Sequence, residues 1–158
     1  MKMHGREISK PNIEVVVIPR SDGDLVFKAQ AVLDYTAFEK LCPVPTPPEK
    51  MLPGGSHSVD VNDKAYNTKL MEWAGKKTDW MVLESLKATE GLEWATVDYS
   101  DHTTWSNYRK EMVGASLSPA EIQRILQAAI DACGLSQEKI DEATERFLAG
   151  QAATSAAE

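Results

Sequence analysis

The sequence predicts an α+β fold that is mostly helical, with an N-terminal β-hairpin, a proline-rich connector and a C-terminal bundle of about four short helices. A β-branched run at residues 13–18 is followed by a turn sequence and a second apolar run, which is typical of a hairpin. Five of the eight prolines lie between Pro43 and Pro53. Beyond residue 60, apolar residues recur at helical spacing, which indicates a helical domain.

These observations divide the chain into four parts. We expect a hairpin and a short helix in 1–42, a connector in 43–59, a helical domain in 60–150 and a frayed tail in 151–158. The 158 residues are 42% hydrophobic and 26% charged, which is ordinary for a globular protein and enough to bury a core.

Charge and hydropathy exclude several classes of partner. The formal net charge is −7 and no basic stripe offsets it, so we expect no binding to nucleic acid. No apolar run approaches the roughly 18 residues of a membrane span, and the N-terminus lacks a secretory signal. Cys42 and Cys133 form no disulfide framework, so we expect reduced thiols in the cytoplasm and no membrane partner.

The N-terminal elements follow from local patterns. Residues 13–18 and 25–33 are the expected strands, and Ser-Asp-Gly-Asp at 21–24 is the turn between them. A two-stranded hairpin is marginal in water, so it should dock on its own helices, a second copy or a partner. Asp34 is placed to cap a short helix over 35–41.

The connector is expected to be extended, because each proline fixes its own φ and biases the residue before it away from helix. Its proline-rich stretch, 43–48, suits either a plain semi-rigid spacer or a strap that binds a partner. Both interpretations remain open from the sequence alone.

From about Asp60 the apolar spacing predicts a long helix that ends at Gly91, with Gly75 permitting a bend near its middle. Asp101 or Thr103 could cap a following helix that ends at Gly114.

Ser118-Pro119-Ala120-Glu121 is a capping box with proline at the first helical position, and Gly134 should end that helix. Its expected apolar face is Ile122, Ile125, Leu126, Ala129, Ile130 and Cys133. Ser136 is expected to cap a last helix whose apolar face is Ile140, Ala143, Phe147 and Leu148.

Residue types that carry catalysis or bind metals do not form a recognisable set. His4, His57 and His102 have no metal-ligand neighbours at suitable spacing and are expected at the surface. Asp98, Asp101 and His102 form the only local cluster of acids with an imidazole, and a helix cap explains Asp101 more simply. Asp22-Gly-Asp24 is better explained as a turn than as a calcium loop. We therefore expect no enzyme activity, metal or cofactor.

Aromatic residues provide the candidate binding sites. All four tryptophans lie between Trp73 and Trp105. We assign Trp80 and Trp94 to the core, whereas Trp73 and Trp105 suit a core or an exposed interface equally. The candidate protein-binding residues are Trp73, Trp105, Tyr108, Met51 and Leu52.

Several segments carry a resemblance: Glu93-Trp94-Ala-Thr-Val97-Asp98, Thr104-Trp105-Ser-Asn107-Tyr108, the Glu121–Ile125 helix and the ending from Glu138 to Leu148. Together, residues 80–148 resemble tail assembly chaperones of long-tailed bacteriophages, over about half of the chain. The matching motifs are helix-packing patterns rather than a catalytic signature. The resemblance implies a non-catalytic protein of the infected bacterium's cytoplasm that coats the tape measure protein and recruits tail tube subunits. It also allows self-association along the client.

Two other functions fit the sequence. A docking hairpin and an extended strap suit a structural virion component, such as a head–tail connector or a tail subunit. An acidic surface suits a small protein that binds and regulates a host factor. Both alternatives, like the first, are binding or assembly functions without covalent chemistry.

Overall fold

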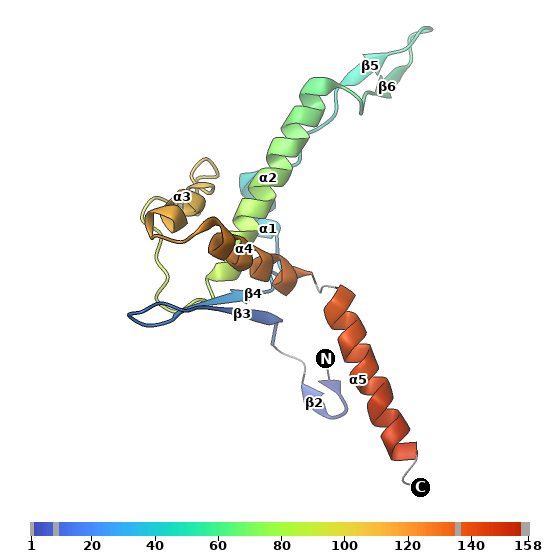
Figure 1. The fold of residues 1–158 in the computed structure, drawn as a ribbon. Helices are drawn as coiled ribbons and strands as arrows, with labels where there is room; N and C mark the ends of the chain where they lie inside the picture. Colours follow the sequence, from blue (N-terminus) through green and yellow to red (C-terminus); the bar gives the residue numbers. More distant parts are fainter. Residues whose placement is uncertain (1, 8–9, 135–136, 156–158) are drawn as a thin grey trace.

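The computed structural model describes residues 2–7, 10–134 and 137–155. These residues confirm the α+β, mostly helical fold, with an antiparallel hairpin followed by helices (Figure 1). The elements are β1 (Lys2–Met3), β2 (Arg6–Glu7), β3 (Ile13–Ile18), β4 (Leu25–Gln30), α1 (Thr36–Leu41), β5 (Glu49–Met51), β6 (His57–Val59), α2 (Lys64–Leu86), α3 (Asn107–Gly114), α4 (Pro119–Cys133) and α5 (Gln137–Ser155).

The strands form three separate two-stranded antiparallel sheets. The sheet of β3 and β4 runs in register from Ile13 opposite Gln30 to Ile18 opposite Leu25, as the sequence predicts. The small β1–β2 hairpin was not expected from the sequence, because strands of two residues carry no alternation of apolar and polar positions. His4 and Gly5 make its turn with φ of +50° and +76°.

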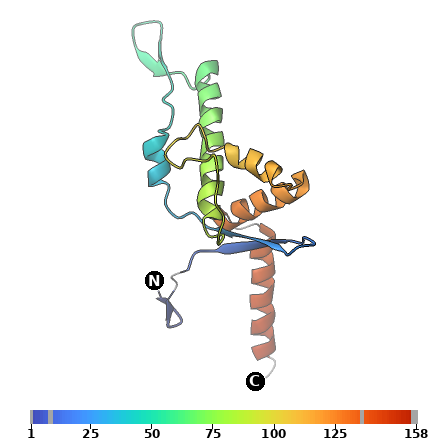
Figure 2. The same cartoon turned by 90° about the vertical axis from the view of Figure 1, so that its left-hand side faces the viewer.

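The β3–β4 hairpin docks on its own helices. In both views it lies across the C-terminal end of α2 and against α4 (Figures 1 and 2). Inward-facing side chains from the hairpin, from α1 and from α2, α3 and α4 form one shared core. The hairpin part and the helical part of the chain are therefore held by a single set of buried residues, which include Ile18, Ala29, Phe38, Leu83, Leu86, Tyr108, Met112, Ile125 and Ala129.

Helix α2 has a buried end and a projecting end. Its buried residues all lie between Trp80 and Leu86, whereas its N-terminal half extends away from the core toward the β5–β6 hairpin (Figure 1). The carboxylate of Asp63 starts the helix by accepting a hydrogen bond from the Tyr66 N–H at 2.7 Å. The helix is continuous through Gly75, so the permitted bend does not interrupt it.

The connector differs from the prediction. Residues 43–48 have no regular structure, but β5 and β6 form a hairpin over residues 49–59, where only extended chain was expected. The reason is local turn chemistry: Gly54 and Gly55 adopt φ of +105° and +84°, and the Leu52 N–H donates to the Ser56 carbonyl at 2.8 Å. The prolines led us to expect an extended chain, whereas these two glycines allow the chain to reverse direction between β5 and β6.

Two helix starts differ in detail from expectation. Helix α3 begins at Asn107, so Trp105 lies in the preceding turn, and Asp101 instead accepts hydrogen bonds from the Thr103 N–H and hydroxyl. Helix α1 has Tyr35 at its N-cap, while Asp34 accepts a hydrogen bond from the Thr36 N–H at 2.8 Å. In both places the aspartate stabilises a turn rather than occupying the cap position.

The C-terminal helices follow the sequence more closely. The capping box of Ser118 and Glu121 is confirmed, and α4 ends at Gly134 as expected. Helix α5 continues to Ser155, so helix extends into residues 151–155, where we expected a frayed tail. The expected cap at Ser136 lies outside the described residues. In the part of the chain that the structure covers, no helix meets the length and apolarity that crossing a membrane requires.

Candidate functional site

The five predicted contact residues divide into three groups. Trp105 and Tyr108 are completely buried, so their prediction as surface contact residues is wrong. The Trp105 indole N–H donates to the Asp98 carbonyl at 3.1 Å, and the Tyr108 hydroxyl donates to Asp79 Oδ1 at 3.1 Å. A polar atom on each ring thus finds a partner inside the protein, which makes full burial of the rings favourable.

Trp73 is half-buried at the base of the projecting part of α2. Its indole N–H donates to the Cys42 carbonyl at 2.9 Å, and its ring centroid lies 5.6 Å from that of Phe38. The Lys77 ammonium lies 5.2 Å from the ring centroid. Trp73 therefore anchors α1 and the start of the connector, and only part of its ring is available to a partner.

Met51 and Leu52 are exposed, at 69% and 41% of their surface. They belong to a projection that we call the arm, formed by residues 43–63, which include the β5–β6 hairpin, and by the N-terminal half of α2 (Figure 2). Further apolar side chains of the arm are exposed between 55% and 77%, and these are Val44, Val59, Val61 and Met71.

These four additional arm residues were not predicted from the sequence. Val59 and Val61 alternate with Asp60, a period-2 signal that the prolines and glycines before them obscured. Met71 lies two residues before Trp73 on α2 and so points away from the anchored face.

A second apolar surface lies on the outer face of the β3–β4 hairpin. Ile13, Val15 and Val17 of β3 are exposed between 45% and 55%, and Val26, opposite Val17, is 46% exposed. The sequence carries the signal, because β3 has apolar residues at both alternating positions: one set reaches the core and the other cannot. A third apolar surface, on α5, includes Phe147 and Leu148 at 64% and 56% exposed.

The other tryptophans agree with their assignment to the core to different degrees. Trp80 is 4% exposed, which confirms the prediction. Trp94 is half-buried and lies edge-on to Tyr108 with 6.1 Å between ring centroids.

Burial, together with the nearby Asp79 carboxylate, raises the pKa of the Tyr108 phenol far above its usual value, so its hydroxyl stays protonated and donates.

The acids near His102 act as turn acceptors. Hydrogen bonds from Ser100 lower the pKa of Asp98, and those from Thr103 lower the pKa of Asp101. Both carboxylates are therefore ionised and engaged with neighbouring hydroxyls, which does not suit a general acid. His102 is half-buried, and its ring lies edge-on to Trp105 rather than at the exposed surface that we expected.

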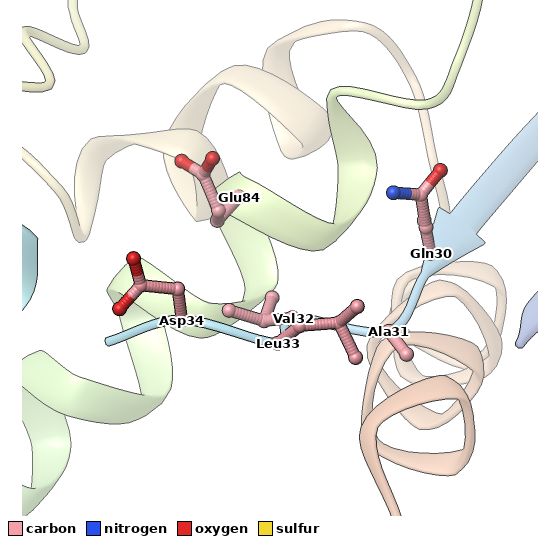
Figure 3. A pocket seen from close by; sticks show the side chains of 6 residues that line it. All are labelled: Gln30, Ala31, Val32, Leu33, Asp34 and Glu84. Atoms are coloured by element: carbon pink, nitrogen blue, oxygen red, sulfur yellow. The ribbon is translucent and has the colours of Figure 1, made fainter. Parts of the chain in front are cut away.

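A shallow pocket of about 250 Å³ lies between residues 30–34 and Glu84 of α2 (Figure 3). The two carboxylates that line it already have partners. Asp34 accepts a hydrogen bond from the Thr36 N–H, and Glu84 forms an ion pair with Lys87. Nor do the residues covered by the structure contain a group of three or more histidines, cysteines, aspartates or glutamates suited to hold a metal ion. The described surface thus offers apolar contact area more than reactive groups.

Comparison of the chain with protein-family models, with curated proteins and with solved structures gives no match.

Proposed function

We propose that this protein is a tail assembly chaperone of a long-tailed bacteriophage, which binds the tape measure protein and recruits tail tube subunits in the cytoplasm of the infected bacterium. Binding is non-covalent and reversible, and no enzymatic step is involved. The observation that carries the proposal is the arm, whose apolar side chains Met51, Val59, Val61 and Met71 are each at least 55% exposed.

The arm suits a client that is long, helical and apolar. Exposed apolar groups gain free energy when a client covers them, and side chains of methionine adapt to irregular partner surfaces. The rest of the molecule supports reversible rather than permanent binding. A formal net charge of −7 opposes non-specific aggregation of a protein with exposed apolar groups.

The resemblance in residues 80–148 contributes in a different way. Its conspicuous aromatic residues, Trp105 and Tyr108, are core residues, so the shared pattern concerns how the helices pack. We therefore assign client binding to the arm, and the resembling region to the scaffold that holds the arm.

The direct test is co-expression with the phage's tape measure and tail tube proteins, followed by pull-down and light scattering. The chaperone proposal expects a soluble complex with the chain present and an aggregated tape measure protein with the chain omitted. A tape measure protein that aggregates equally in both cases contradicts it.

Paired variants locate the contact. Met51→Thr and Met71→Gln replace exposed apolar groups with residues that suit a strand and a helix. Each loses about 1 kcal/mol of contact energy, so the double variant should bind roughly thirtyfold more weakly. Val113→Gln, at a helical position off the arm that is 62% exposed, is the matched control and should bind normally.

A structural virion component is the second candidate, favoured by the projection of the arm and of α5 from opposite ends of the core (Figure 1). Mass spectrometry of purified particles separates the two. Stoichiometric amounts of the chain in the virion favour the structural component, and its absence there favours the chaperone.

A further inference from the structure

The outer edge of β3 carries backbone groups that have no hydrogen-bond partner among the described residues. Val15 lies opposite Lys28. The Lys28 N–H donates to Thr89 Oγ1 at 2.9 Å, and the same hydroxyl donates back to the Lys28 carbonyl at 2.9 Å. Lys28 thus directs its backbone groups away from β3, and Val15 must direct its own away from β4.

The same alternation applies along the strand. Asn12 bonds to Ala31 across the hairpin, which makes the even-numbered residues of β3 the ones that pair with β4. Ile13, Val15 and Val17 therefore present their N–H and C=O groups at the open edge, and within the described residues none of them has a hydrogen-bond partner there. An edge of this kind is a template for another strand.

Two prolines define the length of this edge. Pro11 and Pro19 each lie four residues from Val15 and have no N–H to donate. The donors between them are those of Ile13, Val15 and Val17, arranged symmetrically about Val15. A partner strand that matches this edge best is therefore the same strand running in the opposite direction.

A groove of about 380 Å³ runs beside the edge, between β3 and α4. The residues of α4 that line it, Arg124, Gln127, Ala128 and Asp131, follow a single face of the helix at i, i+3, i+4 and i+7. Arg124 and Asp131 lie at opposite ends of this stripe. An antiparallel copy of the same stripe would place Arg124 against the second copy's Asp131, and the reverse, so the surface is complementary to itself in charge.

The spacing of the layers agrees with this arrangement. Two strands are about 9.6 Å wide at about 4.8 Å per strand. Packed helices lie about 8–10 Å apart. In a pair of copies, each copy contributes two strands and one α4. The width of its two strands therefore matches the distance between two packed α4 helices.

From this geometry we propose that the protein forms a dimer in which β3 pairs antiparallel with β3 of a second copy, about a two-fold axis at Val15. The product is a four-stranded sheet, β4–β3–β3–β4, backed by two α4 helices. Ile13, Val15 and Val17 gain backbone partners, and their exposed side chains form one apolar row with those of the second copy. The proposal does not depend on the chaperone function.

Sedimentation equilibrium and light scattering on the full chain test the dimer. The wild-type protein should dimerise in the micromolar range, and a wild-type protein that remains monomeric at 100-fold higher concentration overturns the proposal. Val15→Lys places two like charges together at the axis and should weaken dimerisation at least tenfold. Val26→Lys, at a position of similar exposure (46% against 55% for Val15) on the same face but on β4, should dimerise normally. Circular dichroism checks that both variants fold.

A charge exchange on α4 gives a second, independent test. Arg124→Asp should weaken dimerisation because it faces Asp131 of the second copy, and Asp131→Arg should do the same with Arg124. The double variant R124D/D131R should restore it. A dimer that persists in Val15→Lys, or single charge variants that the double variant does not rescue, shows that another surface pairs and overturns the proposal.

Discussion

Arg20 and Glu121 form a two-pronged ion pair that joins the end of β3 to the first turn of α4. Arg20 Nη1 lies 2.6 Å from Oε1 of Glu121, and Nη2 lies 3.1 Å from Oε2. The same carboxylate accepts a hydrogen bond from the Ser118 N–H at 2.7 Å, which completes the capping box. The Glu121 side chain thus completes the N-terminal cap of α4 and also holds the β3–β4 hairpin against this helix.

This relationship predicts a dependence of stability on pH. Hydrogen bonds from Arg20 and then from Ser118 lower the pKa of Glu121 to about 2 in the folded protein. In the unfolded chain a glutamate has a pKa of about 4.3. The stabilisation is therefore fully present above that value and is lost as the pH falls toward 2, since the unfolded state then binds the proton more readily.

Urea unfolding of Glu121→Gln and wild type between pH 6 and pH 2 measures the effect. The difference in free energy of unfolding between them should be largest at pH 6 and shrink as the pH falls. Glu72→Gln, which removes an exposed carboxylate from α2, is the control for loss of one negative charge. A difference between Glu121→Gln and wild type that stays constant with pH contradicts the role of the ion pair.

Thr89 should be sensitive to loss of its hydroxyl. The residue is 9% exposed. Its hydroxyl accepts a hydrogen bond from the Lys28 N–H and donates one to the Lys28 carbonyl. Thr89→Val leaves that N–H and C=O unpaired and should cost about 1–3 kcal/mol, whereas Thr89→Ser retains the hydroxyl and should cost less. Hydrogen exchange at the Lys28 amide reports the loss directly. Equal protection of this amide in the two variants argues against the bond.

Phe38 connects α1 to the tryptophans of the core. It is fully buried, and its ring centroid lies 5.6–6.0 Å from those of Trp73, Trp80 and Trp105. Phe38→Ala should destabilise the protein by about 3–5 kcal/mol through the cavity that it leaves. Phe38→Leu should cost about 1 kcal/mol and serves as the variant that still folds. Denaturation monitored by tryptophan fluorescence measures both changes.

The matched control for Phe38 is Phe147→Ala on α5, where the ring is 64% exposed. Its free energy of unfolding should stay within about 0.5 kcal/mol of wild type. A large loss at Phe147 instead indicates that α5 is covered in solution.

Trp73 should act mainly as an anchor. Trp73→Phe keeps an aromatic ring against Phe38 but leaves the Cys42 carbonyl without its 2.9 Å hydrogen bond. We expect a loss of about 1–2 kcal/mol and faster hydrogen exchange in α1, while client binding through Met51 stays normal. Weaker client binding at unchanged stability assigns Trp73 to the contact surface instead.

Elements with strong local signals were predictable from the sequence. Ser118 and Glu121 are three residues apart before an apolar run, and that spacing alone determines the capping box. The β3–β4 hairpin follows equally from its β-branched strands and its glycine turn. The β5–β6 hairpin was missed because the surrounding prolines outweighed two glycines whose positive φ is visible only in the folded chain.

The candidate site depended on tertiary structure. Local pattern places Trp73 and Trp105 on helix-like stretches but does not say which neighbours surround them. The fold brings Phe38 and the carbonyl of Asp98 to Trp105 and buries it completely, while Trp73 stays half-buried at the base of the arm. Burial is set by contacts between residues far apart in sequence, and a local pattern does not contain them.

The sequence by itself determined the class of fold, the start of α4 at its capping box and the absence of a recognisable catalytic motif, because these depend on residues within a few positions of each other. Only the tertiary structure decided which apolar residues remain outside. Val16 and Val17 are adjacent and chemically identical, yet Val16 packs against the core and Val17 is 52% exposed. The physical reason is that a strand has two faces, and α4 and α2 cover one of them.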